Sequence, residues 1–436
     1  MTSAVPIKPL DRAAEAQAVL ETAGLDYPRG SRNSDGQIVG PPRPVLSNVV
    51  SILEADPHYK GRASFDAFRQ RIQWREARAN ETADDVPLSD PHLDALRDEL
   101  GQDYRMHVSA DTAHQAIRRV AKINERHPVR EALAKLPPWD RVDRLSGLLP
   151  RYLGAADTPL NREIGTRWAI SAVARILAPG CKVDTTLVLQ GPQGCGKSTW
   201  VQMMALRPAW FSDTPLNLGD KDAFIGLQGV WLYEIGELAA TRKKDVEIVK
   251  AFLTAQSDRV RLPYDKCTTD LPRQNVFVGT TNEEQFLTDS TGARRFWPVR
   301  VKALDRKALA ADLAQLWAQA LYLYRDARPG SVPWLLPPEV AAELAERHEE
   351  HSARHPWEDA LDGGRIERLT NGQAGLLGFT CSDLLLDLGV ELQHQSRSQE
   401  MILASLLKAR GYERRKVSAN GAREWRYFPA AGGGAV

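Results

Sequence analysis

The sequence predicts an α/β protein with a mainly parallel central sheet, preceded by an all-helical region and followed by a winged-helix-like domain. The first observation behind this is a glycine-rich loop at 191–198, which follows an apolar strand pattern and precedes a helical pattern. The second is the alternation of strand and helix patterns from this loop to about residue 301. The third is the C-terminal stretch, where two helical patterns precede a hairpin that turns at Asn420-Gly421.

Composition along the chain divides it into four segments. Residues 1–44 combine a short helical pattern at 11–22 with a Gly-, Pro-, Ser- and Asn-rich stretch, so we expect a flexible N-terminal arm. Helical patterns separated by polar loops predict an all-helical collar at 45–180. The domain that holds the phosphate loop is expected at 181–330, and the helical and winged-helix-like domain at 331–436.

Charge, cysteine content and hydropathy limit the classes of protein to which this chain can belong. The chain has 57 Lys and Arg against 56 Asp and Glu, so any nucleic-acid contact must come from a local patch. Its 4 cysteines are far apart with no C-x-x-C pair, which is typical of a reducing compartment. There is no apolar run of the ~18 residues that a membrane span needs, and no signal-peptide pattern. We therefore expect a cytoplasmic protein without membrane contact.

The glycine-rich loop satisfies the pattern G-x-x-x-x-G-K-[ST] through Gly191, Gly196, Lys197 and Ser198. Backbone N–H groups in such a loop, and the helix that follows it, cradle phosphates. Lys197 would reach the β- and γ-phosphates and Ser198 would ligate Mg²⁺, so we expect ATP and Mg²⁺ as cofactors. A glycine-rich turn without a ligand is disfavoured, because strand, loop and helix patterns agree. The expected nucleotide-binding residues are Gly191, Pro192, Gln193, Gly194, Cys195, Gly196, Lys197, Ser198 and Thr199.

Two acidic residues follow the next apolar strand, at 230–233. A carboxylate at the end of this strand can hold the water shell of Mg²⁺, and a second one can polarise the attacking water. We assign the metal to Glu234 and the water to Glu237. Spacing alone does not settle these roles, since two residues separate the acids, and Glu237 could instead begin the next helix.

A nucleotide sensor and a pair of arginines come next. The strand at 276–281 ends in Asn282, whose amide can hydrogen-bond both a γ-phosphate and a water. Arg294 and Arg295 follow in the segment GARRFW. In a ring of subunits one of them could reach the γ-phosphate bound by the neighbour, while the other makes an intramolecular salt bridge.

Two β-prone segments around a polar tip, at 259–269, predict a hairpin. Its Arg261, Tyr264 and Lys266 would suit a pore loop, because cations bind phosphate and aromatic rings stack on bases. A purely structural hairpin is the alternative.

The last hairpin lies in a basic stretch, with seven Lys or Arg against two Glu across 408–426. We expect Arg414, Arg415 and Lys416 to contact the backbone of DNA. A protein-docking wing with a solvated basic face is the other interpretation.

The segments GPQGCGKST, WLYEIGEL, RLPYDK, VGTTN and TGARRFWPV, in this order, resemble the virulence-associated protein E family. This family comprises phage and genomic-island P-loop ATPases related to superfamily 3 helicases. The resemblance extends from about residue 47 to residue 301, and it is weaker in the last domain. Several separate motifs in a fixed order are more specific than any one of them.

The resemblance implies an AAA+-type core, a homo-hexamer, ATP hydrolysis between subunits and movement on single-stranded DNA during replication of a mobile element. Residues 1–180 contain no acidic cluster of the kind a primase needs, so a primase or polymerase would be a separate partner. Two alternatives to a helicase stay open: an initiator or loader that melts DNA without processive unwinding, and a nucleotide-switched, protein-binding ATPase in island interference or defence. The catalytic residues carried over are Lys197, Glu234, Glu237, Asn282 and Arg294 or Arg295.

Overall fold

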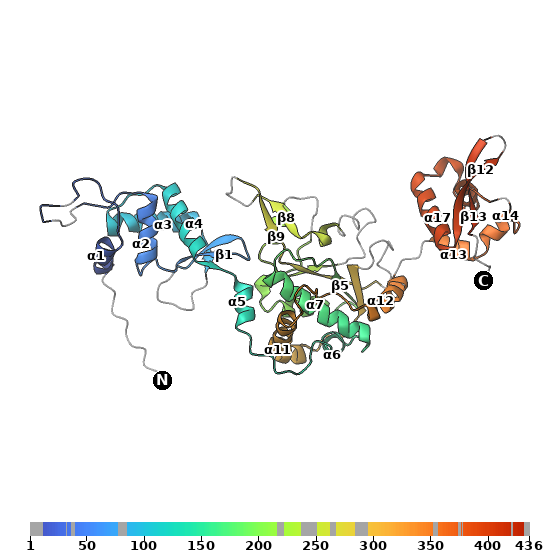
Figure 1. Cartoon of the computed structure of the whole chain (residues 1–436), viewed down its shortest axis with the longest axis horizontal. Helices are drawn as coiled ribbons and strands as arrows, with labels where there is room; N and C mark the ends of the chain where they lie inside the picture. Colours follow the sequence, from blue (N-terminus) through green and yellow to red (C-terminus); the bar gives the residue numbers. More distant parts are fainter. Residues whose placement is uncertain are drawn as a thin grey trace. The chain divides into compact units, whose positions relative to one another are not determined.

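The computed structural model describes residues 12–31, 33–35, 40–76, 85–215, 222–236, 251–261, 267–283, 295–351, 356–373, 376, 378–419 and 422–430. These divide into two compact units, one ending at His351 and one beginning at Pro356. Figure 1 shows the elements of each unit in chain order. No helix among the described residues is both long and apolar enough to cross a bilayer.

A five-stranded parallel sheet forms the centre of the first unit, in the order β11-β5-β10-β7-β6. All five residues of β5 are buried, as expected for a parallel strand covered on both faces. The predicted parallel sheet is therefore confirmed. Its strands are β5 (Thr186–Gln190), β6 (Phe211–Ser212), β7 (Leu232–Ile235), β10 (Val276–Thr281) and β11 (Phe296–Arg300).

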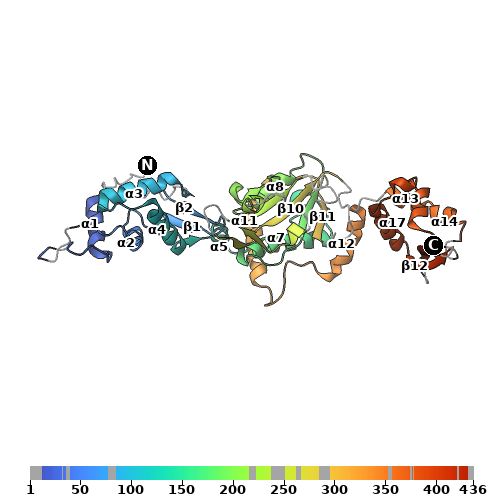
Figure 2. The same cartoon turned by 90° about the horizontal axis from the view of Figure 1, so that it is seen from above.

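Helices pack on this sheet through a tryptophan-rich core, as Figure 2 shows for α7 and α8 beside β10 and β11. The rings of Trp231 and Trp317 lie 4.4 Å apart, and the indole N–H of Trp317 donates to the carbonyl of Met204 at 3.0 Å. Aromatic burial fixes these helices against the sheet, because each ring removes a large apolar area from water. The helices around the sheet are α5 (Pro128–Ala134), α6 (Pro150–Leu153), α7 (Pro159–Leu177), α8 (Lys197–Met204), η1 (Pro208–Trp210), α9 (Asp222–Ile225), α11 (Arg306–Arg325) and α12 (Pro338–His351).

The region before residue 127 is not all-helical, so that prediction is wrong. It contains a four-stranded sheet in the order β3-β2-β1-β4. These strands are two to four residues long, too short to show a clear alternation of apolar and polar residues. The elements are α2 (Leu46–Ala55), β1 (Ala63–Asp66), β2 (Arg71–Trp74), β3 (Val86–Pro87), α3 (Asp90–Tyr104), α4 (Ala110–Ile123) and β4 (Glu125–Arg126).

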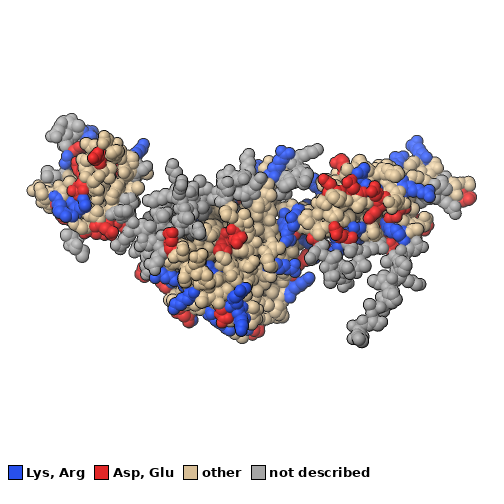
Figure 3. Space-filling view, turned by 180° about the vertical axis from the view of Figure 1, so that it is seen from behind, with Lys and Arg blue, Asp and Glu red and all other residues tan. Residues whose placement is uncertain are grey.

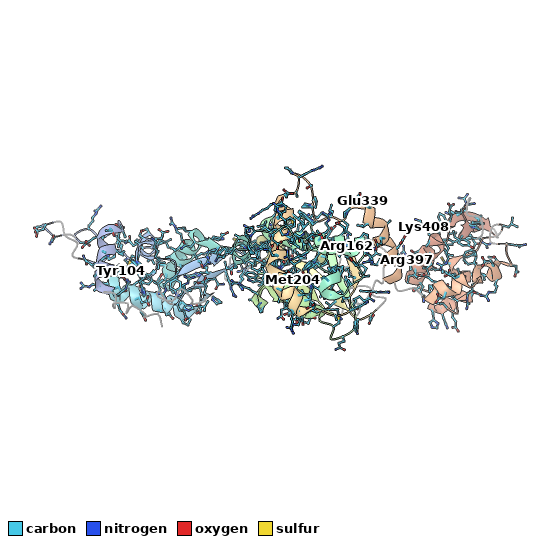
Figure 4. The ribbon with its side chains drawn as sticks, turned by 90° about the horizontal axis from the view of Figure 1, so that it is seen from below. Tyr104, Arg162, Met204, Glu339, Arg397 and Lys408 are labelled. Carbon is cyan, nitrogen blue, oxygen red and sulfur yellow. The ribbon has the colours of Figure 1, made fainter. Side chains whose placement is uncertain are left out.

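Part of the predicted arm is packed. The helix α1 (Arg12–Thr22) buries Ala16 and Val19 in the N-terminal core. Arg12 donates to both carboxylate oxygens of Asp56, at 2.8 and 2.7 Å, and Asp56 also accepts from the Tyr104 hydroxyl at 2.6 Å. Tyr104 is labelled in Figure 4. This network, together with apolar burial, ties the helix down although its own sequence is too short to be stable alone.

The hydrophobic cores place the domain boundaries at positions other than the predicted ones, after residues 44, 180 and 330. One core is built from buried residues between Ala16 and Ala121, whereas the core of the parallel sheet uses Phe68 and buried residues between Val129 and Leu344. The helices α5, α6 and α7 therefore pack with the phosphate-loop domain, not with a separate collar that ends at 180. The helix α12 also belongs to this domain rather than to the C-terminal one.

A short antiparallel hairpin of β8 (Ser257–Val260) and β9 (Thr269–Pro272) is inserted in the chain between β7 and β10. The predicted hairpin is thus confirmed for its two strands, while residues 262–266 lie outside the described part of the chain.

The second unit contains four helices and a final hairpin among its described residues. The strand β12 pairs with β13 from Tyr412↔Pro429 to Ala419↔Ala422, a register that agrees with the predicted turn at Asn420-Gly421, although these two residues lie outside the described part of the chain. Phe379 stacks on Tyr427 and bridges its backbone, so the hairpin is joined to the helical core. The elements are α13 (Pro356–Asp362), α14 (Arg365–Thr370), α16 (Cys381–Asp387), η4 (Leu392–His394), α17 (Arg397–Ala409), β12 (Tyr412–Ala419) and β13 (Ala422–Pro429).

Candidate functional site

The glycine-rich loop connects β5 to α8 at the carboxyl end of the sheet. Gly194 and Gly196 have φ values of 80° and 98°, which residues with a Cβ rarely adopt. A Cβ at Gly191 would lie 2.6 Å from the carbonyl oxygen of Val301. The loop conformation therefore requires glycine at these three positions for steric reasons.

Lys197 begins α8 and folds its side chain back over the loop. Its Nζ donates to the carbonyl oxygens of Gly191 and Pro192, at 2.7 and 2.9 Å. Both acceptors are uncharged, so the ammonium charge remains available to an anion at the N-terminus of the helix.

Glu234, at the carboxyl end of β7, lies directly beside the first turn of α8. The hydroxyl of Ser198 donates to its Oε1 at 2.7 Å, and the hydroxyl of Thr280 donates to the same oxygen at 2.7 Å. The residue is only 4% exposed, and its Oε2 is buried without a hydrogen-bond partner among the described residues. A buried carboxylate oxygen with no donor is costly unless a cation or water reaches it.

These residues fit a hydrated magnesium ion. Ser198 and Glu234 present one hydroxyl and one carboxylate at the phosphate loop, and Mg²⁺ typically binds one or two protein oxygens together with waters and substrate phosphates. Within the described ranges, no three His, Cys, Asp or Glu side chains gather into a metal-binding group.

Asn282 follows β10 and lies next to the phosphate loop. The strands β10 and β5 pair in parallel up to Thr281↔Gln190, and the N–H of Gly191 donates to the carbonyl of Thr281 at 3.1 Å. The exposed Asn282 is therefore adjacent to the start of the loop.

Arg295 lies at the amino end of the parallel strands, whereas the loop lies at their carboxyl end. It precedes β11, whose first residue Phe296 pairs with Thr186 at the start of β5, whereas the loop begins after Gln190 at the end of β5. The Nε of Arg295 is buried and has no hydrogen-bond partner within the described part of the chain. The fold does not bring this arginine to the phosphate loop of its own chain.

Several predicted residues cannot be placed. Glu237, Tyr264, Lys266 and Arg294 lie outside the described residues. Arg261 is described: it follows β8 and is exposed.

Two residues near the loop were missed. Thr280 is a buried polar residue on the same face of its strand as the apolar Val278, a pattern that could have drawn attention to it. Arg300 ends β11 beside the loop, and its Nε donates to Oε1 of Gln190 at 3.3 Å. It could have been noticed only if the order of strands had been known.

The base of the hairpin β8–β9 contains a buried ion pair. Arg273 Nε and Nη2 donate to the two carboxylate oxygens of Asp258, at 2.8 and 2.7 Å, and the side chains are 1% and 2% exposed. Arg273 also donates to the carbonyl of Phe252 and lies over its ring, 4.2 Å from the centroid. The bidentate pair closes the base of the hairpin, because Asp258 lies in β8 and Arg273 directly follows β9, and the contact with Phe252 links this base to the segment before β8.

The predicted basic residues of the last hairpin do not form one surface. Arg414 and Lys416 lie on one face of β12, and Arg415 lies on the other. Elsewhere, basic and acidic side chains are interspersed on the face of the sheet domain drawn in Figure 3.

Comparison with known proteins gives one family match. The model of the virulence-associated protein E-like domain matches residues 133–353. A search of curated proteins finds no match.

Solved structures give distant likenesses. An A-form apo structure of the NrS-1 C-terminal region has a TM-score of 0.47 and 13% identity, with coverage of 85% of this chain and 96% of that one. A second apo structure of that region has a TM-score of 0.45 with the same identity and coverage. A structural similarity this distant gives no information about the ligand or the activity of this protein.

The matched segment spans more than half of the 436 residues and contains the loop, Glu234 and Asn282. The family resemblance drawn from the sequence motifs is confirmed, and the chain belongs to the virulence-associated protein E-like family.

Proposed function

We propose that this protein is an ATP-dependent DNA helicase or translocase that acts in the replication of a phage or other mobile genetic element. The observation that carries the proposal is the contact of Ser198 with Glu234 at the mouth of the glycine-rich loop, with Glu234 Oε2 buried and unpartnered. A phosphate cradle, a helix N-terminus and a strand-end carboxylate are the parts that nucleotide hydrolysis needs.

In this proposal the cofactors are ATP and Mg²⁺. Backbone N–H groups of the loop hold the phosphates, and Lys197 exchanges its two carbonyl contacts for the β- and γ-phosphates. Ser198 and Glu234 hold the metal, which neutralises charge on the phosphates when bound. Asn282, adjacent to the loop, orients the attacking water, and Glu237 takes its proton.

The position of Arg295 supports hydrolysis between subunits. The five residues of β11 separate it from the loop edge, and at about 3.3 Å per residue this is on the order of 15 Å, longer than its side chain. If Arg295 takes part in hydrolysis, it acts on the nucleotide of a neighbouring copy, and from the family resemblance we propose an AAA+-type ring, a homo-hexamer. Arg294 is the alternative finger.

DNA is the proposed substrate, held by the tip of the hairpin β8–β9. Arg261, Tyr264 and Lys266 would contact a single strand by charge and stacking. The Asp258–Arg273 pair would hold the two strands of the hairpin together below this tip. The C-terminal unit would act as a winged-helix-like accessory, and a primase or polymerase would be a separate protein.

One experiment separates this function from its rivals. ATP hydrolysis is measured alone, with single-stranded DNA and with duplex DNA, and displacement of a tailed strand is followed in parallel, with Lys197→Ala as the inactive control. Stimulation by single strands together with strand displacement supports a helicase. Stimulation by duplex alone indicates an initiator or loader, and indifference to DNA indicates a nucleotide-switched protein-binding ATPase.

A further inference from the structure

The hairpin β12–β13 has one strongly basic face. Opposite residues of an antiparallel pair point to the same side, and successive pairs alternate between sides. Lys416 lies opposite Trp425, and Arg414 lies opposite Tyr427, so these four share one side. Arg423 reaches the same side, two residues before Trp425. We call Arg414, Lys416, Arg423 and Trp425 the basic face.

The opposite face is close to neutral. Arg415 lies opposite Arg426, and each pairs with an acid two residues away on its own strand. Arg415 Nη2 is 3.5 Å from Glu413 Oε2, and Arg426 Nε is 2.5 Å from Glu424 Oε1. Both acids of the hairpin therefore point away from the basic face, and the net positive charge is confined to one side.

Trp425 lies among the cations of the basic face. The guanidinium carbon of Arg414 is 4.8 Å and the ammonium nitrogen of Lys416 is 5.7 Å from the centroid of its ring. These distances are in the range of cation–π attraction, which holds both cations close to the ring. Trp425 is nevertheless 47% exposed, whereas Trp168, Trp200 and the other core tryptophans are fully buried.

The described helices of this unit carry acidic side chains among their basic ones, as in the pairs Arg365–Asp387 and Arg410–Asp362. Asp383 and Asp387 are exposed on α16, and α13 begins with acidic residues. Arg397 and Lys408, labelled in Figure 4, lie at opposite ends of α17. A polyanion would thus meet its best charge complement on the hairpin rather than on a helix.

The exposed ring distinguishes a single strand from a duplex. Cations attract the phosphates of either form, but an aromatic side chain can stack only on a base that is not already stacked within a helix. We propose that the basic face binds single-stranded nucleic acid, with Trp425 stacked on an unpaired base and Arg414, Lys416 and Arg423 on the adjacent phosphates. This inference rests on the proposed action on a polynucleotide and adds a second contact outside the hairpin β8–β9.

The test uses the full chain, a labelled oligo-dT, a matched duplex and a salt titration. The variant Arg414→Ala/Lys416→Ala is compared with Arg415→Ala/Arg426→Ala, which removes the same charge from the opposite face. Each lost phosphate contact lowers the slope of log K against log salt by about 0.7 for a single strand, so we expect a fall of about 1.4 for the first variant alone. Trp425→Ala should weaken binding roughly 5- to 100-fold, while Trp425→Phe retains most of it.

Each outcome of these binding measurements either supports or overturns the proposed role of the basic face. Loss confined to the basic-face variants, with little effect of Trp425→Ala on duplex binding, supports it. Equal losses from the two double variants, or unchanged oligo-dT binding by Trp425→Ala, overturn it while DNA-stimulated ATP hydrolysis can still uphold the proposed function. A parent protein that binds no oligonucleotide and hydrolyses ATP without DNA stimulation overturns both.

Discussion

The hydroxyl of Thr280 donates a 2.7 Å hydrogen bond to Oε1 of Glu234, the oxygen that also accepts from Ser198. Two donors on one oxygen fix the orientation of the carboxylate and leave Oε2 as its unpartnered atom. In the proposed metal site, Thr280 would act as a positioning residue for Glu234, because partners behind a ligand determine how it meets the ion.

We predict that Thr280→Val raises the Mg²⁺ concentration needed for half-maximal ATP hydrolysis by roughly 10- to 100-fold. Valine keeps the shape of the side chain but donates no hydrogen bond. Nucleotide binding without Mg²⁺, followed with a fluorescent analogue, should change little, and Thr280→Ser should restore the parental metal dependence. An unaltered Mg²⁺ requirement in the valine variant would contradict the positioning role.

The ion pair under the hairpin predicts a large stability effect. Asp258→Ala leaves the guanidinium of Arg273 buried without its carboxylate, which typically costs about 3–5 kcal/mol in the free energy of unfolding. The chain offers a matched control in the same hairpin, because Arg259 and Asp270 form an exposed pair at 3.5 Å. Asp270→Ala should cost about 1 kcal/mol or less, since water screens that pair. Urea unfolding of both variants measures the difference, and equal losses would show that the buried pair does not anchor the hairpin.

Two histidines predict how stability depends on pH. Burial lowers the pKa of His348, whose ring N–H donates to the carbonyl of Phe296, and burial also lowers the pKa of His127. The unfolded chain, with a histidine pKa of about 6.5, then binds these protons more readily than the folded one. Folding stability should therefore be level above about pH 6.5 and fall as the pH drops below it.

Melting temperatures between pH 7.5 and 5.5 test this expectation. His348→Gln keeps an N–H donor but cannot titrate, so its melting temperature should fall less over this interval than that of the parent. The same slope in both proteins would exclude His348 as a source of the pH dependence.

The contacts that depend on neighbouring residues could be predicted from the sequence, and those that depend on strand order could not. The loop from Gly191 to Ser198 is a local pattern, and the short apolar runs at 187–189 and 276–278 indicated β5 and β10 correctly. The contact of Thr280 with Glu234 joins strands 46 residues apart, and it depends on β10 lying between β5 and β7. The short strands before residue 127 lack an alternating pattern, and they form a sheet only because they pair with each other.

The position of Arg295 predicts complementation between subunits. In the proposed ring, Arg295→Ala inactivates the nucleotide site of the neighbouring copy, whereas Lys197→Ala inactivates the site of its own copy. Mixed rings then contain some interfaces with an intact Lys197 and an intact arginine from the next subunit. Each variant alone should be nearly inactive, and mixing them in equal amounts should restore part of the ATP hydrolysis.

Arg294→Ala provides the comparison, since only one of the two neighbouring arginines is expected to be the finger. The variant that is rescued on mixing identifies the arginine that acts in trans, and native mass measurement with ATP shows whether rings form. If Arg295→Ala alone retains parental turnover, the arginine is not part of the reaction. If Arg295→Ala is inactive but is never rescued in verified mixed rings, the arginine acts only within its own chain. Because the sheet keeps Arg295 away from the loop of that chain, its role would then be structural.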